Sequence, residues 1–237
     1  MRSINLRMKT IGLIGGTSWV STIDYYRIIN ATVNRRLGGN ESAKIILHSV
    51  NYGEIVTHTR KDEWDAINHI ISTAALKAEQ AGADCILLCA NTMHRIADSV
   101  QSAIKIPLIH IATETARTVK DRGLSNILLL GTRYTMNGTF YPAILQQAGL
   151  DVIVPNPTEV DWINDSIYNE MGQGSFLDAT KQKYISLINE YAQRGAEGVI
   201  FGCTEIPMLL KQEDCPVPVF DTTMIHATAA VDFALRD

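Results

Sequence analysis

Cys203 is the residue of this sequence that is best placed to act as a base or nucleophile. It comes just after the apolar run Val199–Phe201, and the stretch 204–207 that follows ends in a proline. A proline in an early turn is typical of a helix start. A helix amino terminus favours a thiolate and lowers the pKa of a cysteine below about 8.5. The alternative is a small buried hydrophobic side chain, the commonest state of a free cysteine.

The other three cysteines, Cys85, Cys89 and Cys215, show no such pattern. Cys85 and Cys89 lie in an apolar run, and no second Cys or His pair follows at zinc-finger spacing. The sequence therefore predicts no metal site.

Short polar residues stand where the apolar runs end, close to glycines. Their side chains and backbone N–H groups could hold a carboxylate at helix amino termini. Ordinary helix capping is the alternative, and the two roles are compatible. We expect both roles for Asn91, Thr92 and Thr204, and leave the choice open for the others. The others are Thr17, Ser18 and Thr132.

Three further groups could assist a thiol or bind a substrate. Glu205 could orient a substrate ammonium group or simply favour a helix dipole. A histidine near a thiol can activate it, and His94 and His226 are the candidates. For both histidines we favour an ordinary surface or capping role.

Short apolar runs alternate with amphipathic stretches along the whole chain. Trp64, Ile67, Ile71, Ala74 and Ala78 recur at helical spacing and predict one apolar stripe. The runs are apolar on both faces, as in strands of a covered parallel sheet, and the alternation indicates an α/β fold. The predicted strands are Ile11–Ile14, Ile45–Leu47, Ile86–Leu88, Leu108–Ile111, Ile127–Leu130, Val152–Val154, Val199–Phe201 and Val217–Phe220.

The order of landmarks repeats after about 115 residues. The Gly-Thr pair at Gly16 returns at Gly131, and the Gly-Ala-acid motif at Gly82 returns at Gly195. The repeat predicts two similar α/β lobes, each with a four-stranded, mostly parallel sheet. We expect one lobe to comprise residues 8–111 with 225–237 and the other residues 112–224, with residues 1–7 as an extension. Because ligands bind at the carboxyl ends of parallel strands, we expect the active site in the cleft between the lobes.

The repeat also discriminates between the cysteines. When Gly82 and Gly195 are aligned, Cys203 matches Ala90 and Cys89 matches Gly202. Because strand side chains alternate between faces, Cys89 should point away from the direction that Cys203 takes.

Two stretches, Asn91–His94 and Gly202–Glu205, resemble the paired signature motifs of the aspartate/glutamate racemases, and 15–19 resembles the amino-terminal loop of that family. The resemblance extends over the chain from Met8. It implies two pseudo-symmetric lobes, a homodimer and no metal, flavin or pyridoxal cofactor. It also implies two thiols that flank the substrate Cα, one removing a proton and the other returning it on the opposite face.

The sequence departs from that family pattern at Ala90, which stands at the position of the first cysteine. A methyl group can neither take nor give a proton. The resemblance further implies that Arg60, in a loop after the second strand, contacts the side-chain carboxylate of the substrate, for which a guanidinium is well suited. The lysine that some members place in the second lobe has no counterpart, because the stretch there reads Glu170–Gly174.

Three functions follow from these features. The first is an isomerase that racemises aspartate or glutamate with Cys203 as base, slowly or in one direction because Ala90 replaces the second thiol. The second is a one-cysteine decarboxylase on the same scaffold, in which the thiol protonates an enolate. The third is a binder of acidic amino acids without turnover.

Composition limits the remaining possibilities. The 237 residues carry a net charge of −4, whereas nucleic-acid binding usually requires a basic excess. No apolar run approaches the ~20 residues that cross a bilayer, and residues 1–7 lack the apolar stretch of a signal peptide. We therefore expect a cytoplasmic protein with free thiols, and a small molecule as its partner.

Overall fold

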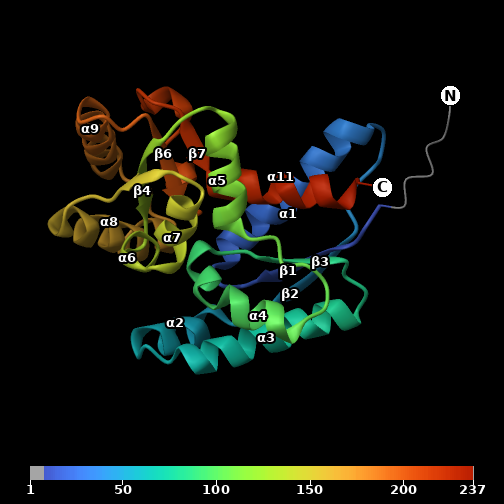
Figure 1. Ribbon diagram of the computed structural model, residues 1–237. Helices are drawn as coiled ribbons and strands as arrows, with labels where there is room; N and C mark the ends of the chain where they lie inside the picture. Colours follow the sequence, from blue (N-terminus) through green and yellow to red (C-terminus); the bar gives the residue numbers. More distant parts are fainter. Residues whose placement is uncertain (1–7, 237) are drawn as a thin grey trace. The chain divides into compact units, whose positions relative to one another are not determined.

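The chain folds into two units, as seen in a computed structural model that describes residues 8–236. Unit 1 comprises Met1–His110 with His226–Asp237, and unit 2 comprises Ile111–Ile225. The expected extension at residues 1–7 lies outside the described residues. Figure 1 shows the elements of both units.

Unit 1 contains a parallel sheet with the strand order β2-β1-β3. Its strands are β1 (Ile11–Gly15), β2 (Ile45–Ser49) and β3 (Cys85–Leu88). β1 is buried along its whole length, but the edge strand β2 is not, and 46% of Leu47 is exposed. The expectation that every apolar run is covered on both faces is thus wrong for β2.

The predicted fourth strand of unit 1, at Leu108–Ile111, is wrong. Only Leu108 pairs, through an isolated parallel bridge to Ile86 on β3. The backbone N–H of Ile109 still donates to the carbonyl of Ile86, but Ile111 already begins the helix α5 (Ile111–Asp121). The chain turns away from the sheet edge too early for a ladder to form.

Helices cover both faces of this sheet (Figure 1). The odd-numbered side chains of β1 and β3, such as Leu13 and Leu87, pack with α1 and α11, whereas the even-numbered ones, such as Ile14 and Leu88, pack with α3. The apolar stripe of α3 is buried as predicted. The helical segments are α1 (Trp19–Leu37), α2 (Tyr52–Arg60), α3 (Trp64–Gln80), the 3-10 helix η1 (Asn91–Ile96), α4 (Ala97–Ala103) and α11 (Thr222–Ala234).

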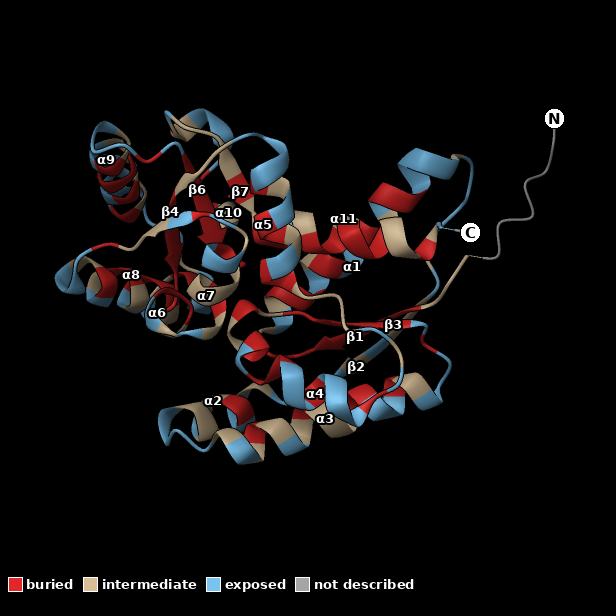
Figure 2. Cartoon of the chain, in the orientation of Figure 1, coloured by how far each residue is buried: buried red, intermediate tan, exposed pale blue. Residues whose placement is uncertain are grey.

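Unit 2 contains a parallel sheet with the order β5-β4-β6-β7. The strands are β4 (Asn126–Gly131), β5 (Asp151–Ile153), β6 (Gly198–Gly202) and β7 (Val219–Asp221). β6 is buried throughout, and β4 after its first residue (Figure 2). The helical segments are α5, α6 (Arg133–Asn137), α7 (Phe140–Gln147), α8 (Pro157–Asn169), η2 (Met171–Gln173), α9 (Asp178–Gln193), α10 (Ile206–Leu209) and η3 (Gln212–Asp214).

The two parallel sheets and their helices confirm the predicted α/β class. The two repeated glycines take the same conformation, with φ of 99° at Gly82 and 104° at Gly195, just before β3 and β6. Such a backbone favours glycine because a side chain would be strained there. Among the residues that the structure describes, no helix is both long and apolar enough to span a membrane.

Candidate functional site

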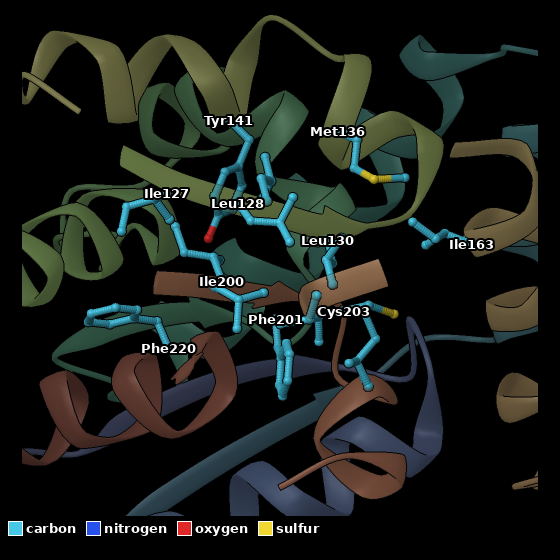
Figure 3. Packing of buried hydrophobic residues seen from close by; sticks show 14 of the residues in the cluster. Ile127, Leu128, Leu130, Met136, Tyr141, Ile163, Ile200, Phe201, Cys203 and Phe220 are labelled. Carbon is cyan, nitrogen blue, oxygen red and sulfur yellow. The ribbon is translucent and has the colours of Figure 1, made fainter. Parts of the chain in front are cut away.

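Cys203 lies directly after the last residue of β6, at the carboxyl edge of the unit 2 sheet. Its side chain joins the large hydrophobic cluster of unit 2 and is only 7% exposed (Figure 3). The thiol Sγ lies 2.9 Å from Oε2 of Glu205 and donates a hydrogen bond to it. The hydroxyl of Thr204 donates to the same oxygen at 2.7 Å. Because Oε2 accepts two hydrogen bonds, the arrangement suits an ionised carboxylate.

The structure corrects the expected direction of the Cys203 pKa. Burial raises this pKa well above its usual value, and the neighbouring carboxylate of Glu205 raises it further. Backbone N–H groups of Glu205 and Thr204 act in the opposite direction but do not prevail. The expected helix does begin at Ile206, but α10 has only four residues, which is too short to outweigh burial and a nearby negative charge.

Tyr184 is a neighbour of this thiol that the sequence did not reveal. Its buried phenol on α9 shares a 2.9 Å hydrogen bond with Ser166. Charge on Cys203 helps to raise the pKa of this phenol, although burial is the larger cause. A tyrosine inside an amphipathic helix resembles any other core aromatic residue, so its sequence carries no signal of this proximity.

Thr132 and Cys203 follow the ends of two neighbouring strands of the unit 2 sheet. Gly131, the last residue of β4, pairs with Gly202, the last residue of β6. Thr132 and Cys203 are therefore the first residues after the two strands. Thr132 is buried and caps α6, because its hydroxyl accepts a hydrogen bond from the backbone N–H of Thr135 at 3.3 Å. The capping role that the sequence left open is thus present.

At the equivalent edge of unit 1, Ala90 follows β3 by two residues. Its half-buried methyl packs in the cluster on the α3 side of the sheet, whereas Cys89 is fully buried in the cluster on the side of α1 and α11. The two neighbours therefore point to opposite faces, as the alternation predicts. Because Cys89 points to the opposite face, it is not a substitute for a thiol at position 90, and burial also raises the pKa of its thiol far above its usual value.

Asn91 and Thr92 begin η1 immediately after Ala90, where Asn91 is buried and Thr92 half-buried. Thr17 and Ser18 follow β1, the strand next to β3. The hydroxyl of Ser21 on α1 donates to the carbonyl of Cys89 at 3.0 Å and ties the two strand ends together. Four of the predicted polar residues of unit 1 are thus placed at one sheet edge.

The turn after β1 is built around Gly16, whose φ is +80°. A Cβ there would lie 2.1 Å from the carbonyl oxygen of Val50, so the position cannot hold a side chain. Its N–H donates to the hydroxyl of Thr22 at 2.9 Å. The turn leaves Thr17 only 7% exposed, and the hydroxyl of Thr17 has no hydrogen-bond partner among the described residues.

Arg60 is not in a loop, which corrects the expectation from the sequence. It is the last residue of α2 and is exposed. Asn51 starts this helix by accepting a hydrogen bond from the N–H of Gly53 at 2.9 Å. The threonine-rich stretch continues it, since the hydroxyls of Thr57 and Thr59 bond to carbonyls four residues earlier.

Three histidines of unit 1 lie together, the buried His94 and His226 and the half-buried His110, which was not anticipated. The ring of His94 lies 4.6 Å from that of His110 and 5.4 Å from that of His226. Nε2 of His226 donates to the carbonyl of Ile109, and Nδ1 accepts from the hydroxyl of Tyr25, each at 2.7 Å. Burial lowers the pKa of His226 to about 3 and that of His110 to about 4. Both His94 and His226 are buried and neutral, which corrects the surface or capping role that we favoured.

In the described part of the chain, no three His, Cys, Asp or Glu side chains come together in a way that could hold a metal ion. All four cysteines are free.

Two solved structures match nearly the whole of this chain. A protein of Yersinia pestis assigned to the Asp/Glu racemases has 46% identical residues, covers 97% of this chain and 100% of its own, and superposes with a TM-score of 0.91. An aspartate racemase homologue from Pyrococcus horikoshii OT3 has 36% identity, the same coverage and a TM-score of 0.84.

More distant relatives also match most of the chain. The broad specificity amino-acid racemase RacX of Bacillus subtilis (strain 168) is 26% identical over 172 residues, which are 73% of this chain and 74% of RacX. Glutamate racemase from Francisella tularensis, solved with D-glutamate, shares the fold with a TM-score of 0.67 at 18% identity, over 96% of this chain and 81% of its own. The profile of the Asp/Glu/hydantoin racemases matches residues 14–230. With nearly its whole length matched in this way, the chain belongs to the Asp/Glu/hydantoin racemase family, whose enzymes are isomerases.

Proposed function

We propose that this protein removes and returns the Cα proton of aspartate or glutamate, with Cys203 as the base. The observation that carries the proposal is the buried thiol at the carboxyl end of β6, in contact with a carboxylate and with two backbone N–H groups. Carboxyl strand ends are where α/β folds bind ligands. The membership in a racemase family supports Cα chemistry over other reactions of a thiol.

The reaction begins when Cys203 loses its proton and the resulting thiolate takes the Cα proton from one face of the substrate. A second thiol would return a proton on the opposite face, but position 90 offers only a methyl group. Water or a neighbouring group must then supply that proton. One positioned acid or base contributes about 10²–10⁴-fold to a rate, so the enzyme should be slow or one-directional rather than inactive.

Substrate binding falls to the polar strand ends. We assign the α-carboxylate to Thr17, Ser18, Asn91, Thr92, Thr132 and Thr204. The buried hydroxyl of Thr17, without a partner among the described residues, supports a ligand there. Arg60 would meet the side-chain carboxylate. We further propose that the protein needs no cofactor, forms a homodimer and functions in the cytoplasm, where its free thiols stay reduced.

The proposal is tested by incubating the protein with each enantiomer of aspartate and glutamate and following the opposite enantiomer by chiral chromatography. We expect slow formation from at least one of the four, and none with Cys203→Ala. If wild type and Cys203→Ala give the same traces, Cys203 is not the base. Neutral amino acids serve as the substrate control, because they lack the carboxylate assigned to Arg60.

One observation favours the decarboxylase alternative. Cys203 rests as a thiol and therefore as a proton donor, which is the form that protonates an enolate after carbon dioxide leaves. A single thiol suffices for that reaction. Release of carbon dioxide from an arylmalonate, with no exchange of Cα protons in amino acids, would replace the racemase assignment. Saturable binding of aspartate or glutamate with neither reaction would identify a binder.

A further inference from the structure

We propose that Glu205 is a catalytic residue, the direct proton acceptor of the Cys203 thiol. This inference rests on the proposed function and assigns Glu205 a role in it.

The geometry of the carboxylate carries the argument. Glu205 stands at the N-cap position of α10, yet its side chain makes no capping hydrogen bond to that helix. It turns back instead, and Oε2 accepts from Sγ of Cys203 at 2.9 Å and from the hydroxyl of Thr204 at 2.7 Å. The side chain is buried, since only 6% of the residue is exposed. A surface glutamate that merely favours a helix dipole would not take this position.

The contact gives the thiol proton a place to go. In the resting pair the sulfur carries the proton and the carboxylate is ionised. Transfer of that proton breaks the S–H bond and forms an O–H bond, which leaves a thiolate beside a neutral carboxylic acid. The thiolate then removes the Cα proton and becomes a thiol again, and the electron pair of the Cα–H bond remains on the substrate. The proton on Glu205 is then lost to solvent, which restores the resting pair of thiol and carboxylate.

The state of position 90 makes this acceptor more important. With Ala90 there, one thiol must be deprotonated and reset in every cycle. Backbone N–H groups of Glu205 and Thr204 face the sulfur and stabilise the thiolate once it forms. The neutral acid at position 205 no longer repels that thiolate. The pair therefore keeps the thiol protonated at rest, and a single proton transfer to Glu205 converts it to a thiolate.

The test compares wild type with Glu205→Gln in two measurements whose expected changes have opposite signs. The Cys203 thiolate is measured by its absorbance near 240 nm, as the difference from the matching variant that also carries Cys203→Ala. We expect about tenfold more thiolate at a fixed alkaline pH in Glu205→Gln, equivalent to one pH unit, because the negative neighbour is gone. Cα proton exchange of the reactive amino acid in D₂O should fall at least about 100-fold, because the acceptor is gone.

The conservative variant Glu205→Asp keeps the charge but has a shorter side chain that reaches Sγ less well. We expect its rate of Cα proton exchange to lie between the rates of wild type and Glu205→Gln. This variant also serves if Glu205→Gln does not fold. Exchange that is unchanged or faster in Glu205→Gln or in Glu205→Asp would overturn the role of Glu205, as would an unchanged thiolate titration in Glu205→Gln. Absence of exchange in the wild type, with all four acidic enantiomers, would instead show that the proposed function itself is wrong.

Discussion

The backbone carbonyl of Ala90 accepts a 3.1 Å hydrogen bond from Nδ1 of His94. Position 90 is thus held in place through its main chain, while its side chain contributes only a methyl group to the neighbouring cluster. Because the bond does not involve the side chain, substitution at this position should leave the backbone of η1 where it is.

Ala90→Cys is therefore expected to create the missing second thiol. We expect conversion of aspartate or glutamate in both directions, with the slower direction faster by about 10²–10⁴-fold, the usual contribution of one positioned acid or base. Chiral chromatography from each pure enantiomer measures both rates. Ala90→Ser is the matched control, because it has nearly the same size but is a poor acid and base. Equal rates in Ala90→Cys and Ala90→Ser would contradict a proton-transfer role for position 90.

Arg60→Ala should weaken substrate binding. The loss of a hydrogen bond between charged groups costs about 1.5–3 kcal/mol, so we expect the KM for the dicarboxylate to rise by about 10–150-fold with little change in kcat. Arg35→Ala is the control, since Arg35 is an exposed arginine in the last turn of α1 and changes the net charge equally. If the two variants have the same KM, Arg60 does not contact the substrate.

Much of the fold could be predicted because apolar runs and glycines report local backbone requirements directly. The limits are also specific. The run at Leu108–Ile111 is as apolar as a strand, but the chain leaves the sheet after one bridge. The aromatic pair Tyr25-Tyr26 recurs as Phe140-Tyr141, but the first member of one pair and the second of the other are fully buried, Tyr25 and Tyr141. Apolar composition and repeat spacing do not determine where a chain leaves a sheet or how a helix is rotated about its axis.

The buried pair of Tyr25 and His226 offers a test of this packing. Tyr25→Phe removes the donor to Nδ1 of His226 and leaves a buried acceptor unsatisfied. We expect the free energy of unfolding to fall by about 1–3 kcal/mol. Tyr26 is the adjacent residue and is 55% exposed, so Tyr26→Phe should change the free energy of unfolding little. Urea unfolding at neutral pH compares the two, and equal losses would contradict the hydrogen bond.

The histidine cluster should make unit 1 sensitive to acid. The pKa values of His110, about 4, and His226, about 3, lie below the ordinary 6.5, and burial also lowers the pKa of His94. The unfolded chain therefore binds more protons than the folded one below pH 6.5. The stability that the neutral rings provide is full above this pH and is lost as the pH falls toward 4 and 3. Each such ring contributes a slope of about 1.4 kcal/mol per pH unit in this range.

Urea unfolding of wild type and His110→Gln between pH 8 and pH 4.5 measures this slope. Among the groups that act on His110, the charge of Asp98 raises its pKa, but burial prevails. In His110→Gln, we expect the slope of the free energy of unfolding against pH to decrease below pH 6.5 by the amount that corresponds to about one proton. An unchanged slope would show that His110 is protonated in the folded protein.

The site was harder to predict than the fold for the same kind of reason. The sequence places Cys203 correctly after β6, and its proline at position 207 predicts the helix start that the structure shows at Ile206. It does not show that the Glu205 side chain turns back toward Sγ, nor that α10 ends after four residues. The prediction that the pKa of Cys203 is lowered was wrong for these two reasons. Side-chain direction depends on packing, which two adjacent positions in a sequence do not determine.

The most direct test of the account follows the Cα proton itself. The protein is incubated in D₂O with each enantiomer of aspartate and glutamate, and the loss of the Cα proton signal is measured by NMR beside Cys203→Ala. We predict exchange of one enantiomer in preference to its mirror image, abolished in Cys203→Ala. Measurable binding without exchange of any of the four, or exchange that persists in Cys203→Ala, would contradict the claim that Cys203 removes this proton.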